Sequence, residues 1–298
     1  MRETPSVRWE SPDGGVGVGV GGPVTPITHG PLPVIDLLDG AFAAIRHRPR
    51  TLLSIVAVIV LPFAFLEGYL SRGVLGGAGL GDVFDDPTLI QSASGQGQFG
   101  GLIVQLLDLA QIAIVGVPVS RVIGGWLEGK ETGVREALWY LVRRGWVVLV
   151  ACVLNHVAQA IGFILLVFPS LAVMLLFSLT SPVIALEPHH GPVEALSRSW
   201  RLVRRRFGSV FAVVALTGIV GYGVSNAVEL LPGVVSLIIG TDRAWPLISV
   251  AAMLSSLVLM PFTSGAMALL YLDIRFRTEG LDIETRLRNA TRETDGRF

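Results

Sequence analysis

The longest apolar stretch of the chain, from Gly145 to Leu186, limits what the protein can fold into more than any other feature. It contains about 42 residues, about twice the roughly 20 that one helix needs to cross a bilayer. Pro169 and Ser170 lie near its middle. The stretch therefore predicts a tight hairpin of two transmembrane helices, the first at about 145–167 and the second at about 170–186.

Four other apolar stretches are also long enough to cross a bilayer. They predict spans at about 51–69, 99–123, 208–230 and 245–271, the last of them kinked or tilted at Pro261. Composition agrees, because 51% of the residues are hydrophobic, 15% are charged and the mean hydropathy is +0.64. An average soluble domain carries roughly 25% charge. So little charge cannot cover a soluble surface, which argues against a water-soluble enzyme.

Three amphipathic segments each end in a basic cluster and run directly into a predicted span. They are residues 34–48, 134–144 and 191–207, in which apolar side chains recur at helical spacing. We expect interfacial helices on the cytoplasmic side, and the recurring order of one such helix and two spans favours three parallel repeats. The simpler alternative is that any basic cytoplasmic loop precedes a span. The predicted fold is an all-α polytopic membrane protein with about six transmembrane helices plus these interfacial helices.

The chain divides into three parts. Residues 1–33 are rich in Gly and Pro and predict a disordered cytoplasmic tail. Residues 34–278 hold the six predicted spans, with a Gly-rich loop at 71–98 between the first two, and residues 279–298 form a polar cytoplasmic tail. The N-terminal segment lacks the apolar run that a cleavable signal peptide requires, so none is expected.

The distribution of basic residues predicts the orientation, because cytoplasmic loops carry an excess of Lys and Arg. With both termini in the cytoplasm, only Arg72 and Arg243 fall outside, and the arginine clusters that precede spans stay inside. All but one of the 23 basic residues are arginines, which together with abundant Gly, Ala and Val suggests a high-GC bacterial genome. We therefore expect a multi-pass protein of a bacterial plasma membrane.

The basic clusters also predict the partners. Arg side chains can reach lipid phosphates while aromatic rings lie at headgroup level, and each Arg near an anionic surface contributes about 1 kcal/mol. We expect membrane lipids as partners, alongside an unidentified membrane-protein partner. The balance of 23 basic and 23 acidic residues argues against nucleic acid. The alternative is that the arginines only determine topology. The candidate headgroup contacts are Arg143, Arg144, Arg198, Arg201, Arg204, Arg205 and Arg206.

Polar side chains inside two predicted spans form a candidate intramembrane cluster. Ionisable groups there are costly and are functional candidates by default. At 1.5 Å per residue, Asp108 lies about 12 Å from the outer edge and His156 about 16 Å from the inner edge of a core of about 30 Å, so their depths are similar. Such a pair is able to relay protons or bind a cation; the alternative is a buried polar cluster that holds helices together. The cluster comprises Gln105, Asp108, Gln111, Asn155, His156 and Gln159.

No catalytic motif is recognisable. The chain has no HExxH, no GxSxG and no Walker loop. Its one cysteine, Cys152, excludes an intrachain disulfide and a cysteine metal cluster. Glu187, His189 and His190 are three potential metal ligands in a short turn, which alone is a weak metal signal. We therefore predict no cofactor, no metal site and no enzymatic activity.

Three short motifs resemble those of a known family. The segment YLDIRFRTEGLD at 271–282 resembles the YxDxRxRxEGLD ending of a family of bacterial, mainly actinobacterial, integral membrane proteins of uncharacterised function. Segments 187–202 and 37–50 resemble its other two hallmarks, and the three motifs span most of residues 35–285. That family is similar to the membrane domain attached to some glycerophosphoryl diester phosphodiesterases. The residues of the ending motif are Tyr271, Asp273, Arg275, Arg277, Glu279, Gly280 and Asp282.

The resemblance implies little about activity. The chain has no soluble barrel domain, so phosphodiesterase activity is not carried over. The charged residues of the ending motif are expected to form a network that holds the C-terminal segment on the Arg-rich cytoplasmic surface.

We predict a non-catalytic scaffold or accessory protein of the cell envelope that associates with anionic lipid. The alternative is a transporter or permease-like protein that uses the polar residues of the second, third and fifth spans. A membrane-embedded enzyme that acts on lipid headgroups is a third alternative.

Overall fold

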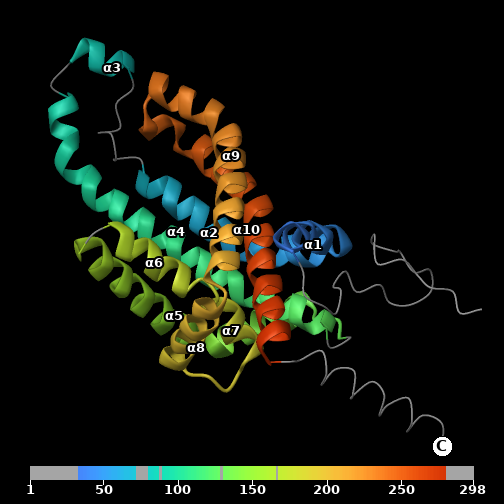
Figure 1. Ribbon diagram of the computed structural model, residues 1–298. Helices are drawn as coiled ribbons and strands as arrows, with labels where there is room; N and C mark the ends of the chain where they lie inside the picture. The colour runs from blue at the N-terminus through green and yellow to red at the C-terminus, as the bar shows by residue number, and fades with distance from the viewer. Residues whose placement is uncertain (1–32, 72–79, 87–88, 128–129, 166, 280–298) are drawn as a thin grey trace, which may run out of the picture.

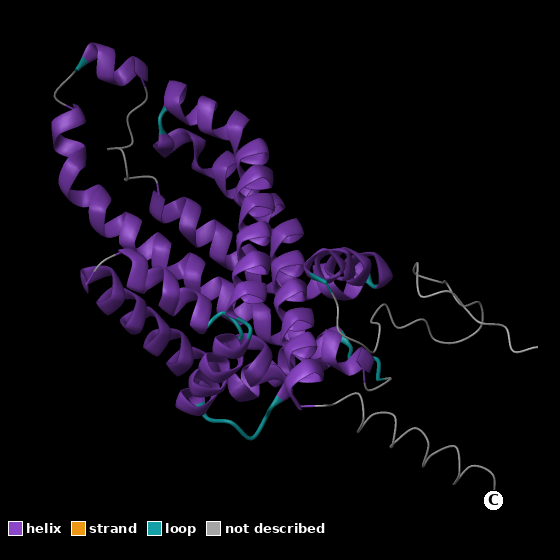
Figure 2. Cartoon of the chain, viewed as in Figure 1, coloured by secondary structure: helices purple, strands orange, loops and turns teal. Residues whose placement is uncertain are grey.

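The described part of the protein consists of helices joined by short turns. The computed structural model describes residues 33–71, 80–86, 89–127, 130–165 and 167–279, and these contain no strand (Figures 1 and 2). Six helical segments are long and apolar enough to cross a membrane. The prediction of an all-α polytopic protein with six spans is therefore confirmed. Most of the two predicted tails, at 1–32 and 280–298, lies outside the described residues.

The helices follow the predicted order with two differences. One short helix is added before the second span, and the fourth span is divided into two helices. Their bounds are α1 Val34–His47, α2 Pro49–Ser71, α3 Leu80–Asp85, α4 Leu89–Leu127, α5 Val134–Leu165, α6 Val167–Leu176, α7 Thr180–Leu186, α8 Pro192–Arg205, α9 Phe207–Ile239 and α10 Thr241–Glu279.

The last helix, α10, is the central packing element. It packs against α9, α2, α4 and α1, and its buried side chains include Phe262 and Tyr271. Helix α1 lies across α10 and is seen nearly end-on in Figure 1. Small residues of α1 permit this approach: a Cβ at Gly40 would lie 2.9 Å from a methyl group of Leu269, and Ala41 is fully buried. Phe42 stacks on Phe262 with ring centroids 4.3 Å apart.

The three predicted interfacial segments differ in whether a break separates them from the span that follows. Helix α1 ends at His47, before Arg48, and a proline at position 49 disfavours helical geometry in the residue before it. A single residue, Arg206, likewise separates the end of α8 from the start of α9. The segment 134–144, in contrast, continues into the third span as the single helix α5, because Gly145 costs a helix only about 1 kcal/mol. The expectation of a separate interfacial helix there is therefore wrong, and the threefold repeat stays a prediction.

The fourth span is divided by a turn at residues 177–179, between α6 and α7. Backbone groups inside a bilayer need partners within the protein. The hydroxyl groups of Ser178 and Thr180 supply two of them, donating to the carbonyls of Leu175 at 2.8 Å and Phe177 at 2.7 Å. The hydroxyl residues therefore compensate for the interruption of the helix.

The loops between the helices are shorter in the structure than the sequence predicts. The expected loop at 71–98 contains α3, and α4 begins at Leu89. The predicted spans at 208–230 and 245–271 leave Pro232 in a connecting loop, but Pro232 lies inside α9, which continues to Ile239. Helix α10 passes through Pro246 and Pro261 without interruption. Transmembrane helices tolerate proline because neighbouring groups satisfy the freed carbonyls. Pro232 therefore misled the placement of the end of the fifth span.

The hairpin between α5 and α6 is closed by a direct approach of Gly162 to the backbone of the next helix. A Cβ on Gly162 would lie 2.9 Å from the amide nitrogen and 3.0 Å from the Cα of Ser170. Gly162→Ala is therefore expected to lower the free energy of unfolding by about 1–3 kcal/mol, the usual cost of overpacking. Thermal unfolding of the detergent-solubilised protein measures the change.

Gly218→Ala in α9 is the matched control, because no atom lies within 4 Å of the added Cβ there. Equal melting temperatures for the two variants would contradict the close approach of the hairpin.

Candidate functional site

Glu187, directly after α7, is a buried carboxylate that is only 5% exposed. A buried charge is costly unless it is paired and hydrogen-bonded. Its Oε1 accepts a hydrogen bond from the hydroxyl of Tyr271 at 2.6 Å. The Nε and Nη2 of Arg198 donate to the same oxygen, each at 3.1 Å. Glu187 thus connects the α7–α8 turn to α8 and to α10.

Two further residues of α10 extend these contacts. The Nε of Arg275 donates to Oε2 of Glu279 at 2.8 Å, and its Nη1 donates to the hydroxyl of Tyr271 at 3.3 Å. Arg198 also forms an ion pair with Glu279. Two carboxylates, two guanidinium groups and one tyrosine hydroxyl therefore form a connected set of contacts. We call Glu187, Arg198, Tyr271, Arg275 and Glu279 the Glu187 cluster.

The ionisation of Glu187 reflects competing effects. Burial alone would raise the pKa of this carboxyl group. The hydrogen bonds from Tyr271 and Arg198, together with the positive charges of Arg198 and Arg275, outweigh burial and hold the pKa of Glu187 below its ordinary value. The carboxylate is therefore negatively charged at neutral pH, and its charge is balanced within the cluster.

Side chains from α4 and α5 support the end of α7. The last four carbonyls of a helix have no partner within it. The hydroxyl of Tyr140 donates to the carbonyl of Ile184 at 2.6 Å, and Arg121 donates to that of Ala185 at 3.5 Å. Arg144 donates to the carbonyl of His190 in the turn that follows. The backbone on both sides of Glu187 is therefore held by neighbouring helices.

Helix α8 has one face packed on the protein and one open face. The buried face includes Ser199, whose hydroxyl donates to the carbonyl of Leu176 at 2.8 Å. Two shallow surface grooves run along the open face. One is lined by Arg201, Arg204 and Arg205; the other is lined by His189, His190, Val193, Glu194, Ser197 and Arg201.

The seven arginines predicted to contact lipid headgroups divide into two groups. Arg143, Arg201, Arg204 and Arg205 are exposed, and Arg206 is half-buried. Arg144 and Arg198 are bound within the protein by His190 and by the Glu187 cluster. Sequence spacing alone could not separate these two groups, because the partners of Arg198 lie on distant segments.

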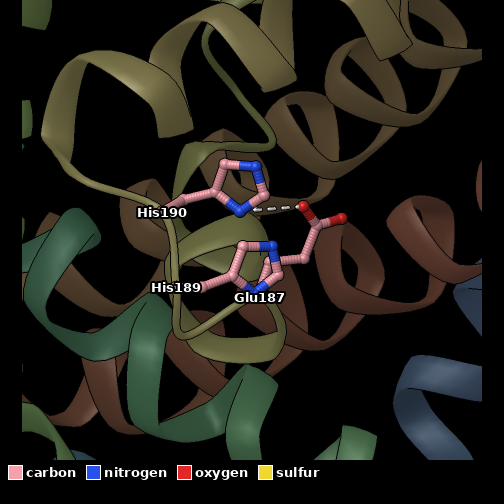
Figure 3. Close-up of side chains that lie close together, drawn as sticks. All are labelled: Glu187, His189 and His190. Carbon is pink, nitrogen blue, oxygen red and sulfur yellow. Dashed lines mark ion pairs between the residues drawn. The ribbon is translucent and has the colours of Figure 1, made fainter.

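Glu187 and two neighbouring histidines bring potential metal ligands together (Figure 3). One ligand atom from each of Glu187, His189 and His190 lies within 4.8 Å of the other two. Nδ1 of His190 is 3.1 Å from Oε2 of Glu187, the oxygen that Tyr271 and Arg198 do not use. His189 is exposed, and His190 is half-buried.

Among the side chains that the structure describes, the members of the predicted intramembrane cluster make separate contacts. His156 contacts its own helix, with Nδ1 2.5 Å from the carbonyl oxygen of Cys152. The amide of Gln159 donates to Asn155 one turn away at 3.2 Å. Gln111 is fully buried in α4. Gln105 lies in α4, but its side chain is outside the described part of the structure.

Asp108 instead lies near carboxylates from two other helices. Its charge interacts with those of Glu67 in α2 and Glu229 in α9. Asp108 lies close to the start of the apolar span at Leu106, and Glu67 lies close to the end of the span at Leu70. The group is therefore at the end of the helices opposite to the Glu187 cluster. Sequence reasoning missed Glu67, although an acidic residue inside a predicted span is itself a signal.

The C-terminal motif lies mostly inside α10. Tyr271, Arg275 and Glu279 belong to the Glu187 cluster, whereas Arg277 pairs with Asp273 at 2.9 Å within the helix. Gly280 and Asp282 lie outside the described residues.

Removal of the Tyr271 hydroxyl tests the importance of the Glu187 cluster. Tyr271 is fully buried, and a hydrogen bond to a charged group contributes about 1.5–3 kcal/mol. Tyr271→Phe is expected to lower the free energy of unfolding by that amount, as measured by denaturant unfolding in detergent. Tyr222→Phe is the control, because Tyr222 is 75% exposed. A Glu187→Gln, Tyr271→Phe double variant with strictly additive losses would show that the two groups do not interact.

Comparison with known proteins finds a match to one domain whose function is not assigned. Residues 133–274 match the model of a domain of unknown function, DUF7847. The match runs from α5 into α10 and includes Glu187, Arg198 and Tyr271, while Arg275 and Glu279 lie just beyond it. No curated protein and no solved structure matches the chain. A DUF7847 domain is therefore found in this membrane protein, and the resemblance to phosphodiesterase membrane domains stays a prediction.

Proposed function

We propose that this protein is a non-catalytic scaffold or accessory protein of a bacterial plasma membrane that binds anionic lipid through the open face of α8. The observation that carries the proposal is the row of Arg201, Arg204 and Arg205. All three are exposed, and none forms an ion pair within the described residues. Unpaired arginines near a membrane surface attract lipid phosphates.

The position of α8 supports contact with headgroups. Its buried face packs on α5, α6 and α7, so it lies against the ends of membrane helices. Trp200 is 38% exposed and contacts Phe177, in the turn that divides the fourth span, with ring centroids 6.0 Å apart. Indole rings favour the interface between hydrocarbon and water. An exposed tryptophan beside three exposed arginines is typical of a helix at this depth.

The distribution of charge supports a cytoplasmic location for α8 and for both termini. The exposed arginines of α8, together with Arg46, Arg50 and Arg143, precede spans at one end of the helices. At the opposite end, where α3 lies in Figure 1, Arg243 is the one basic residue among those described, and it pairs with Asp82 at 3.4 Å. This asymmetry follows the positive-inside rule.

The triple variant R201Q/R204Q/R205Q tests the lipid proposal. At about 1 kcal/mol for each arginine, the affinity for phosphatidylglycerol is expected to fall by about a hundredfold. Native mass spectrometry of the full chain, titrated with phosphatidylglycerol and with phosphatidylcholine, measures the number of bound lipids. Wild-type protein is expected to prefer the anionic lipid.

Two controls accompany this measurement. Lys at the same three positions keeps the charge and is expected to keep most of the binding, and Arg243→Gln removes a charge from the opposite end. Undiminished phosphatidylglycerol binding by the triple Gln variant would contradict the proposal.

The acidic group at the outer end favours a second candidate, a transporter or permease-like protein. Glu67, Asp108 and Glu229 come from three different helices, and Oε1 of Glu67 is buried without a hydrogen-bond partner. Carboxylates grouped in a membrane protein are typical of ion or proton pathways.

The corresponding test uses proteoliposomes that contain a pH-sensitive dye and carry an imposed proton gradient. If the group conducts protons, wild-type protein dissipates the gradient faster than empty vesicles, and Asp108→Asn slows this at least tenfold. Glu136→Gln, in the first turn of α5, is the control. A wild-type rate equal to that of empty vesicles would exclude proton conduction as the transport activity.

A further inference from the structure

The turn between α7 and α8 brings together a donor set that suits a metal ion. It contains two imidazole groups and one carboxylate, from His189, His190 and Glu187, in which the ligand atoms lie within 4.8 Å of one another (Figure 3). Two histidines and one glutamate are a donor set found in open zinc sites, where three protein ligands leave a position for water. Imidazole and carboxylate together favour a divalent transition metal over calcium or magnesium, which prefer oxygen ligands alone.

The distances agree with this chemistry. Ligands at about 2.0–2.1 Å from a tetrahedral zinc ion are about 3.4 Å apart, and Nδ1 of His190 lies 3.1 Å from Oε2 of Glu187. This Nδ1 is buried, and despite the short distance it has no aligned hydrogen-bond partner. His189 is exposed, so rotation of its side chain is able to bring the third ligand inward.

The surroundings orient the ligands. Metal-binding carboxylates and histidines are normally held by a second layer of hydrogen bonds. Oε1 of Glu187 is fixed by Tyr271 and Arg198, which leaves Oε2 directed toward His190. Arg144 binds the carbonyl of His190 and fixes the backbone of the turn. The carboxylate and the half-buried histidine are therefore arranged before any ion binds.

The charges nearby permit a cation. Arg198 and Arg275 are balanced within the Glu187 cluster by Glu187 and Glu279. Glu194 and Arg201 bring opposite charges to the groove that His189 and His190 line, so together they add no net positive charge, and this groove is open to solvent. Water or an anionic oxygen therefore has access to the remaining coordination positions.

We propose that Glu187, His189 and His190 form a binding site for a zinc-type divalent transition-metal ion. This proposal departs from the sequence-based expectation of no metal site, because the sequence showed only three ligand residues in a turn and not their convergence. The proposal is independent of lipid binding by α8. Its competitor is a purely structural contact between His190 and Glu187.

The test is titration of the full chain in detergent with Zn²⁺ by calorimetry and with Co²⁺ by visible absorption. The protein is purified without a polyhistidine tag and first treated with a chelator. We expect one ion per chain and, for Co²⁺, the visible bands of a site with imidazole ligands and low coordination number. His189→Gln and His190→Gln are each expected to weaken binding at least tenfold.

His47→Gln is the matched control, because His47 packs edge-on against Trp126 and does not belong to the group of three ligand residues. It is expected to leave metal binding unchanged. The two histidine variants are chosen instead of a Glu187 variant because His189 and His190 are more exposed than Glu187, and their melting temperatures without metal verify folding. Absence of stoichiometric binding by wild-type protein, or equal binding by wild type and both variants, would overturn the proposal.

Discussion

The half of this structure that carries α8 depends on the need to neutralise one buried carboxylate. Glu187 is held at the end of a membrane span, where an unpaired charge would be strongly destabilising. Its partners come from α8 and from the last turns of α10. The hydrogen bonds and ion pairs of the Glu187 carboxylate therefore fix the direction in which the chain leaves the fourth span. They also fix the positions of α8 and of the C-terminal end of α10.

The membrane spans could be predicted from sequence because their signal is local. Apolar length alone located all six, and Pro169 correctly marked the hairpin between α5 and α6. The helix ends were less predictable. Pro232 lies inside the continuous helix α9, since packed neighbours in a membrane protein compensate for what proline removes. The continuity of α5 through Gly145 was likewise not predicted, because glycine costs a helix only about 1 kcal/mol and does not have to end it.

The candidate sites were predictable only as sets of residues. The sequence identified the arginines, the C-terminal motif and the Glu187 turn, but not their grouping. Arg198 and Glu279 are 81 positions apart in the chain, and their ion pair exists only because α8 and α10 meet. Asp108 was paired with His156 by depth alone, whereas the structure places it near Glu67 and Glu229. Depth along a helix is readable from sequence, while the direction in which a residue faces around the bundle is not.

The contact between Tyr271 and Glu187 also has a consequence for synthesis of the protein. The two residues are separated by 84 positions, so a ribosome that adds about 5–20 residues per second completes Glu187 roughly 4–17 seconds before Tyr271. During this interval the carboxylate has Arg198 and water as partners and lacks the hydroxyl of Tyr271. The last transmembrane helix therefore completes the Glu187 cluster as well as the membrane bundle, and a nascent chain released before this point would lack both.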